Sequence, residues 1–312
     1  DKDCTPLDLA RGQSADCTIR LQNRSQDPVD VSLTDEIPSR MALDPDSVVG
    51  ADVPGDNLIE FNGTLVGMDP PIITVESAVS PHGYVSLASF GTIAPLGCPE
   101  NCDDGGFIVD GIDIDYAGVH YTSGIVSVNG TLELGTASGL PASHINQNLP
   151  DVALPNNVLA PWWTDLDLRT SGNWYWGRLQ QDAIQWDVFE WEDVPRYGDA
   201  SSTFTFQIWL ERGTDNIHFV YDDYTGVTTG GTTGAESDDG TVGDTRYFDG
   251  TGILPWAGGS DLRVSAVPGA PGSAHTISYT KEAVKKGKWE NCAEMTSTQG
   301  NAINCVDGKI TN

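Results

Sequence analysis

The sequence predicts an all-β protein built from two antiparallel β-sandwich domains of the jelly-roll or immunoglobulin-like kind. Short segments in which apolar and polar residues alternate, as in half-buried strands, recur along its 312 residues. Apolar residues at helical spacing are nearly absent. The 35 Gly and 18 Pro residues interrupt most windows and supply turns. Each of these observations disfavours helical domains.

A small immunoglobulin-like sandwich is expected over residues 1–80. Its strands are predicted at residues 18–22, 29–33, 58–61 and 72–75. Pro38 would end the second pairing, because proline cannot donate a hydrogen bond to a ladder. The dipeptide Asn62-Gly63 has residues suited to positive φ and is predicted to form a turn.

A larger sandwich is expected over residues 81–268, after a Pro- and Gly-rich boundary between about residues 78 and 104. The dipeptides Asn129-Gly130 and Asp249-Gly250 predict turns in it. Its predicted strands lie at residues 107–109, 125–128, 132–134, 184–191, 203–210 and 217–221.

The remaining tail, residues 269–312, begins after a Gly- and Pro-rich stretch and has a predicted strand at 276–279. A basic run at 281–288 and the last cysteine pair follow. Two placements stay open for this C-terminal strand and disulfide hairpin. It could pack on the first domain, or it could begin a further module.

The six cysteines form three local pairs, which we interpret as disulfides: Cys4 with Cys17, Cys98 with Cys102, and Cys292 with Cys305. Local pairing is one of many possible connectivities. Zinc is the alternative for the Cys-x-x-x-Cys pair, although no His lies near it in the sequence. Disulfides indicate an oxidising compartment, so we expect a secreted or cell-surface protein.

Charge disfavours two classes of partner. The chain has 45 Asp and Glu against 16 Lys and Arg, a net charge of −29. Binding to nucleic acid needs clustered Lys and Arg, and so does binding to anionic membrane surfaces. No run of about 20 apolar residues is available to cross a bilayer, so we expect no membrane insertion. A saline or calcium-containing exterior would suit such an acidic protein.

Residues 149–167 read Leu-Pro-Asp-Val-Ala-Leu-Pro-Asn-Asn-Val-Leu-Ala-Pro-Trp-Trp-Thr-Asp-Leu-Asp. This run resembles the PNN-LAPFW-DL signature of the non-catalytic C-terminal regions of secreted bacterial subtilisin-like (subtilase) serine proteases. The resemblance covers about residues 80–265. Supporting pieces occur in the family's order at residues 126–130, 186–195, 204–209 and 234–236.

Upstream, residues 21–25 and 31–38 are similar to immunoglobulin-like repeats of bacterial surface proteins. The protease domain's own motifs are missing: there is no Gly-Thr-Ser-Met-Ala, and His82-Gly83 is followed by Tyr84 instead of Thr. The resemblance therefore implies an accessory region and not the hydrolytic unit. Its expected partners are an adjoining protease domain or an extracellular protein or polysaccharide surface.

Two interpretations are open for the dense aromatic residues of the larger domain. They could fill the core, or they could stack on sugar rings. Trp174 and Trp176 would share one strand face in a segment bounded by Gly and Asn, so we select them as candidates for exposure and ligand binding. Trp186 and Trp191 would point to opposite faces of a strand, and we expect only one of them in the core.

Acidic loops are the candidate metal sites. Between Asp222 and Asp249, seven carboxylates accompany a single basic residue, Arg246. Calcium takes oxygen ligands from such side chains and from Gly-rich turns, although the spacing is not that of an EF-hand. A solvated acidic surface is the alternative. The tentative calcium ligands are Glu236, Asp238, Asp239 and Asp244. A second acidic set is formed by Asp103, Asp104, Asp110, Asp113 and Asp115.

Paired carboxylates could also act as the acid and base of a glycosidase. Asp165 with Asp167, and Glu190 with Glu192, have the required residue types. However, a spacing of two residues is also that of the solvent-facing side of a strand. We therefore predict no catalytic residues and a non-catalytic accessory region that aids stability, secretion or attachment. A carbohydrate-binding or adhesin module is the alternative, and a glycoside hydrolase is a third.

Overall fold

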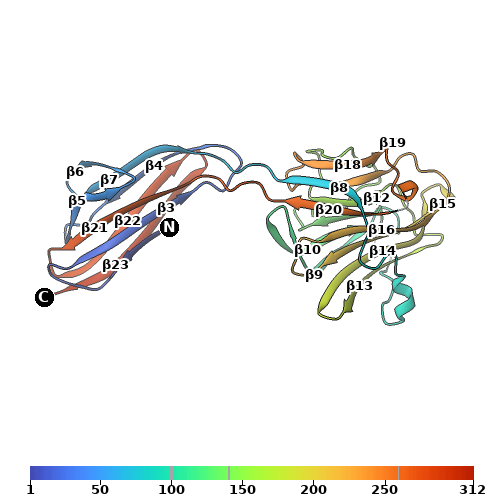
Figure 1. Ribbon diagram of the computed structural model, residues 1–312, viewed down its shortest axis with the longest axis horizontal. Helices are drawn as coiled ribbons and strands as arrows, with labels where there is room; N and C mark the ends of the chain where they lie inside the picture. The colour runs from blue at the N-terminus through green and yellow to red at the C-terminus, as the bar shows by residue number, and fades with distance from the viewer. Residues whose placement is uncertain (98–101, 140, 259) are drawn as a thin grey trace. The chain divides into compact units, whose positions relative to one another are not determined.

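A computed structural model describes residues 1–97, 102–139, 141–258 and 260–312 (Figure 1). Its regular structure is almost entirely β-strand in several antiparallel sheets, which confirms the predicted fold class. The chain forms two units. Asp1–Pro70 and Ala270–Asn312 together make the first unit, and Pro71–Gly269 makes the second.

The first unit is a sandwich of two sheets (Figure 1). One sheet has the order β1 (Lys2–Thr5), β3 (Ser14–Gln22), β21 (Ala274–Ala283) and β5 (Met41–Val49). The other has the order β2 (Leu9–Ala10), β23 (Gly300–Thr311), β22 (Gly287–Ser297), β4 (Val29–Glu36), β7 (Leu58–Leu65) and β6 (Asp52–Gly55). The C-terminal tail therefore supplies strands to both sheets of the first unit, beside β3 and beside β4.

The core of the first unit follows from the alternation of its strands. In β3 and β4, buried and exposed residues alternate without a break. Since successive side chains of a strand point to opposite faces, one apolar row from each sheet meets the other in the interior. Ile19 and Leu33 belong to this core together with Ile277 and Trp289.

Two of the three predicted disulfides are present in the first unit. Cys4–Cys17 joins β1 to β3, and Cys292–Cys305 joins β22 to β23. In both cases the two cysteines are directly opposite each other in the ladder. Each bridge therefore links neighbouring strands of one sheet. The third predicted pair is Cys98 with Cys102, and Cys98 lies outside the described residues.

One predicted turn of the first unit is wrong. Asn62-Gly63 lies inside β7, where Asn62 pairs with Ser32 of β4. Ser32 Oγ donates a hydrogen bond to Asn62 Oδ1 at 2.6 Å, so the side chain supports the ladder. A Cβ on Gly63 would lie 2.7 Å from the ring of Phe61, so glycine makes room for this ring within the strand.

The second unit is a larger sandwich. One sheet runs β19 (Thr251–Gly252), β18 (Gly243–Phe248), β17 (Thr232–Glu236), β12 (Val158–Trp163), β11 (Thr131–Leu134), β10 (Val119–Ser127) and β9 (Gly106–Tyr116). The other runs β13 (Asn173–Gln181), β14 (Ile184–Arg196), β15 (Asp199–Glu211), β16 (Ile217–Tyr224), β20 (Asp261–Val267) and β8 (Ile72–Ala78).

The strand predicted at residues 72–75 belongs to this second unit and not to the first. It forms part of β8, which pairs with β20 from Ile72 opposite Val267 to Ala78 opposite Asp261. The first unit accordingly ends at Pro70, earlier than the expected boundary near residue 80. The pattern of a single strand identifies its buried face but not the sheet that it joins, which explains the difference.

In the second unit, the sheet that runs from β13 to β8 has apolar contacts on both of its faces. The main core lies on the inner face and includes Trp162 and Trp191. On the outer face, residues 79–97, which we call the covering segment, pack over the sheet through Leu87 of the short 3-10 helix η1 (Leu87–Phe90). The backbone N–H of Leu96 also donates to Trp174 O at 2.8 Å.

Two predictions about tryptophan are corrected. Trp186 and Trp191 point to opposite faces as expected, but both are buried, because the covering segment encloses the face that Trp186 occupies. Trp174 is only 1% exposed and stacks on Phe107, so it is not the exposed residue that we predicted. Trp176 is partly buried and packs against the main core.

Candidate functional site

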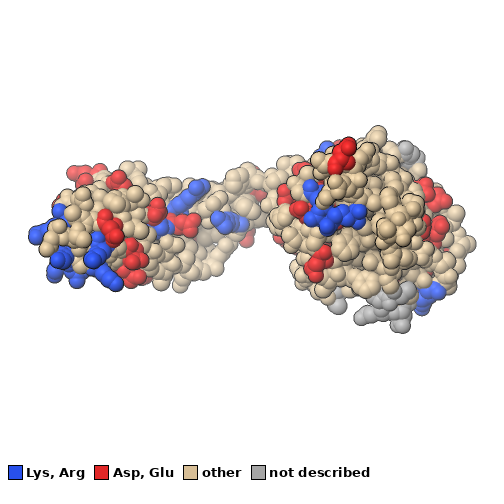
Figure 2. Space-filling model, turned by 90° about the horizontal axis from the view of Figure 1, so that it is seen from below, with Lys and Arg blue, Asp and Glu red and all other residues tan. Residues whose placement is uncertain are grey.

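In the view of Figure 2, acidic side chains are scattered over both units, and Lys and Arg gather at one end of the first unit but also occur farther along it and on the second unit. The many carboxylates on this surface are consistent with the net charge of −29. Within the described part of the chain, no helix is long and apolar enough to span a membrane.

The four candidate calcium ligands have different surroundings. Glu236 ends β17 and is fully buried, while Asp238 is exposed to solvent. Asp239 Oδ1 accepts hydrogen bonds within its own loop from Ser237 and Thr241. Asp244 Oδ2 accepts the backbone N–H of Val75 at 2.7 Å and so attaches β18 to β8. Among the described residues, neither group of closely spaced metal-ligand atoms includes any of these four side chains.

Glu236 has an unusual position among these four residues. Its Oε2 accepts the backbone N–H of Asp151 at 2.9 Å, and its Oε1 has no hydrogen-bond partner. Burial raises the pKa of this carboxyl to about 8, because the charged form is poorly solvated there. Glu236 is therefore protonated at neutral pH and holds the loop that contains Asp151.

A different set of three carboxylates does come together. Ligand oxygens of Asp103, Asp104 and Asp165 lie within 4.8 Å of one another, and we call these residues the Asp103 cluster. Asp103 and Asp104 precede β9, and Asp165 follows β12. A backbone hydrogen bond of 2.9 Å from Leu168 N to Cys102 O holds the two segments together.

The surroundings of the Asp103 cluster are partly basic. Arg169 lies 3.4 Å from Asp103 and 2.8 Å from Asp167, and His144 Nδ1 lies 3.3 Å from Asp104. Burial raises the pKa of Asp103 and of Asp165, although Arg169 and His144 partly oppose this. Three carboxylates in this arrangement could hold a divalent cation through oxygen ligands.

The other group of close ligand residues is Glu290 with Cys292 and Cys305. Its two sulfur atoms are consumed by the disulfide, so it is not a metal centre. Asp113 and Asp115, from the second predicted acidic set, lie on one face of β9 as expected. They flank His120, whose ring nitrogens are 3.6 and 2.8 Å from them.

The carboxylate pairs considered for catalysis have structural partners. Asp167 accepts two hydrogen bonds of 2.8 Å from the Arg169 guanidinium, which lowers the pKa of Asp167. Glu190 is fully buried beneath the covering segment. Its Oε2 accepts the N–H of Leu87 and its Oε1 the amide of Gln207, both at 2.9 Å. Burial nevertheless raises the pKa of Glu190 to about 7.

Glu192, on the same face of β14, also contacts the covering segment. Ser86 Oγ donates a hydrogen bond to Glu192 Oε1 at 3.0 Å, and Tyr175 OH lies 3.4 Å from Oε2. Gln207 Nε2 reaches across to Val85 O at 2.7 Å. Glu190, Glu192 and Gln207 thus anchor the covering segment on the sheet. No local pattern predicts this contact, because Gln207 and residues 85–87 are about 120 positions apart.

A pocket of about 340 Å³ lies in the second unit beside the turn η3 (Pro255–Gly258). Trp256 and Tyr221 contribute aromatic rings to it, and Asp222 and Asp261 contribute carboxylates. The indole N–H of Trp256 is buried without a hydrogen-bond partner. Sequence reasoning placed Trp256 among the aromatic residues but could not single it out, because the pocket is assembled from four separate segments.

The comparisons with known proteins concern this unit. The family model described as NIDO related matches residues 103–251. No match was found among curated proteins or among solved structures. The matched range begins at Asp103 and contains Asp165, Glu190 and Glu236. The part of the chain that is similar to the NIDO-related family therefore holds the Asp103 cluster and both buried glutamates with strongly raised pKa.

Proposed function

We propose that this chain is a non-catalytic, extracellular region of a larger secreted or surface protein, where it supplies stability or attachment to an adjoining domain. A subtilisin-like protease is the adjoining domain that the motif at residues 149–167 favours. The two disulfides are in keeping with an oxidising exterior. The match over residues 103–251 covers the same β unit as the motif.

The observation that carries the proposal is that both carboxyl oxygens of Glu190 are occupied by hydrogen bonds from within the protein. A buried carboxyl with a pKa of about 7 has the character of a general acid or base. However, both of its oxygens already accept hydrogen bonds, from Leu87 and from Gln207. A general acid or base must reach a substrate proton. Glu190 is 0% exposed, so its environment suits an anchor for the covering segment.

The proposal is tested by assaying the intact chain for hydrolysis of casein, small peptide esters and a panel of polysaccharides. We expect no turnover of any of them. Turnover that a serine-directed inhibitor abolishes would contradict the proposal, and so would glycan hydrolysis that disappears in Glu190→Gln. Retention of the labelled chain on extracellular protein or polysaccharide surfaces is the expected positive result.

Sugar binding is a second candidate, favoured by the pocket at Trp256. Its size is in the range of small-ligand sites, and aromatic rings beside carboxylates suit a sugar. Titration of the chain with a glycan panel, followed by Trp fluorescence, tests this function. A response that Trp256→Ala removes and Trp176→Ala retains would support it. Unchanged fluorescence across the panel would refute it.

A further inference from the structure

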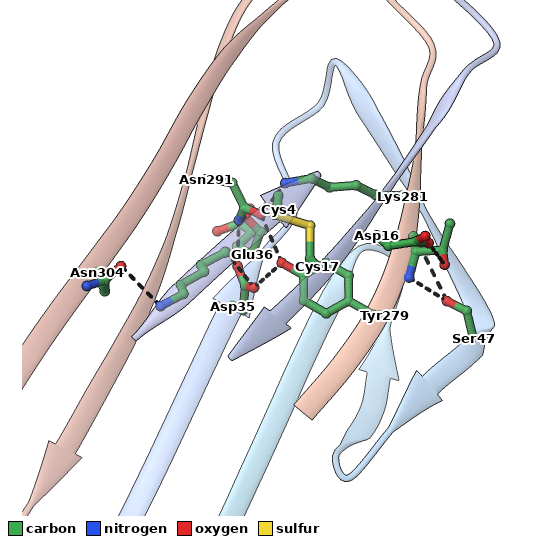
Figure 3. Close-up of a disulfide and its surroundings, with 12 residues drawn as sticks. Cys4, Asp16, Cys17, Asp35, Glu36, Ser47, Tyr279, Lys281, Asn291 and Asn304 are labelled. Atoms are coloured by element: carbon green, nitrogen blue, oxygen red, sulfur yellow. Dashed lines mark hydrogen bonds and ion pairs between the residues drawn. A yellow bond between two sulfur atoms is a disulfide. The ribbon is translucent and has the colours of Figure 1, made fainter. Parts of the chain in front are cut away.

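A buried polar cluster lies in the first unit, away from everything discussed so far (Figure 3). It consists of Lys2, Asp35, Tyr279, Lys281 and Asn291, which we call the Lys281 cluster. No member is more than 6% exposed. The residues come from β1, β4, β21 and β22, so both sheets contribute. Two amines, one carboxylate and one carboxamide are unusual contents for a sandwich core.

Asp35 is the hydrogen-bond centre of the Lys281 cluster. Its Oδ2 lies 2.7 Å from Lys2 Nζ and accepts the Tyr279 hydroxyl at 2.7 Å. Its Oδ1 accepts a hydrogen bond from Asn291 Nδ2. Lys2 therefore serves as the counter-ion of Asp35, since both side chains are fully buried.

Lys281 is the second amine, and its partner is the carboxamide of Asn291. Nζ lies 2.8 Å from Asn291 Oδ1, and the ring of Trp289 covers it at 4.1 Å from the ring centroid. Burial and the positive charge of Lys2 lower the pKa of Lys281 to about 7, although Asp35 opposes this. Near neutral pH, a large fraction of the amine is thus uncharged and nucleophilic.

We propose that Lys281 and Asn291 react with each other to form an intramolecular isopeptide bond. The Nζ lone pair forms a bond to Cγ of Asn291, and the Cγ–Nδ2 bond breaks. One proton passes from Nζ to Nδ2, which leaves as ammonia. The reaction needs no oxidant and no other reactant. The amine already contacts the carboxamide that it would attack, with Nζ 2.8 Å from Oδ1, so the two reacting groups are held together.

Two other members of the cluster contact the carboxamide of Asn291. Asp35 accepts a hydrogen bond from Nδ2, so its carboxylate can carry the proton to the leaving nitrogen. Tyr279 OH lies 3.1 Å from Oδ1, where negative charge develops during the attack. Burial and Asp35 raise the pKa of Tyr279, so its phenol stays protonated. Its single proton, which Asp35 Oδ2 accepts in the structure, would turn to Oδ1 as charge develops there.

The bond would join the two layers of the first unit. Lys281 lies in β21, in the sheet with β3, and Asn291 lies in β22, in the sheet with β4. Cys4–Cys17 and Cys292–Cys305 each link neighbouring strands within one sheet. The isopeptide bond would therefore add a covalent constraint that neither of these disulfides provides.

Mass spectrometry of the intact wild-type chain, after reduction and denaturation, tests the proposal. We expect a mass lower than that of the sequence by one ammonia. Trypsin does not cleave after an acylated lysine, so digestion should give residues 264–285 joined to 289–309. Lys281→Arg and Asn291→Ala should each restore the full mass. Asp35→Ala should also restore it, although both reacting residues remain. Exposed Lys288→Arg is the matched control and should keep the loss.

The wild-type measurement alone decides, so the result does not depend on whether a variant folds. The full sequence mass in the wild-type chain would overturn the proposal. Ammonia can also leave an Asn-Gly dipeptide through ring closure, and the chain has such dipeptides at Asn62 and Asn129. A mass loss that maps to either of these residues, with 264–285 and 289–309 unlinked, would equally overturn it.

Discussion

The buried carboxyl of Glu190 gives the second unit a stability that depends on pH. Its pKa is raised from 4.5 to about 7 in the folded chain. Between these pH values, the folded state holds a proton that the unfolded chain has released. The stabilisation is therefore complete below about pH 4.5 and is lost as the pH rises through about 7. Each pKa unit corresponds to about 1.4 kcal/mol, so the full loss is about 3 kcal/mol.

Glu190→Gln removes this titration while keeping the shape of the side chain. Urea unfolding at pH 5 and pH 8, followed by Trp fluorescence, is the assay, because every tryptophan except Trp289 lies in the second unit. Between these pH values, we expect the free energy of unfolding to fall by about 2 to 3 kcal/mol more in the wild type than in the variant.

The buried Glu236, with a pKa of about 8, contributes in the same direction in both proteins, so the comparison isolates Glu190. Glu76→Gln, at an exposed position of β8, is the matched control and should keep the wild-type pH dependence. If Glu190→Gln and the wild type lose equal stability between pH 5 and pH 8, the reasoning about this carboxyl is wrong.

Three further outcomes are expected. Trp191→Ala removes a ring that stacks on Phe206 at 5.0 Å in the core, and should lower the free energy of unfolding by about 3 to 5 kcal/mol in urea titrations; a change below about 1 kcal/mol would contradict the core assignment. Replacing Cys292 and Cys305 by Ser should lower the stability of the first unit by about 3 kcal/mol, measured by calorimetry, whereas an unchanged melting temperature would show that the bridge constrains little. Calcium should raise the melting temperature of the second unit, and Asp165→Asn should remove that rise; no shift in the wild type would exclude the Asp103 cluster as a calcium site.

Local patterns were sufficient for about half of the strands. Alternation predicted the segments at residues 18–22 and 29–33, which lie within β3 and β4. A β-strand has a period of two, so its buried face can be read from a few residues. The two ladder disulfides were also accessible, since their partners are only 13 positions apart.

The sites depend on contacts between residues that are far apart in the chain. A single sequence shows no local pattern that predicts such contacts. Asp165 meets Asp103 and Asp104 across about 60 positions, although the sequence suggested Asp167 as its partner. Trp186 is buried by a covering segment with no strong pattern of its own, and Trp174 is buried in the main core, where it stacks on Phe107. Lys281 begins the basic run at 281–288, yet it is fully enclosed and contacts Asn291.

In the sequence, the second unit is inserted between the two parts of the first unit. This arrangement affects the order in which the units can fold during synthesis. A ribosome releases residues 71–269 as a continuous stretch, and their sheets can close as soon as that stretch has emerged. The earlier residues must wait, because β3 and β4 lack their neighbours β21 and β22 until the last part of the chain appears. The middle of this protein is therefore expected to complete its folding before the beginning does.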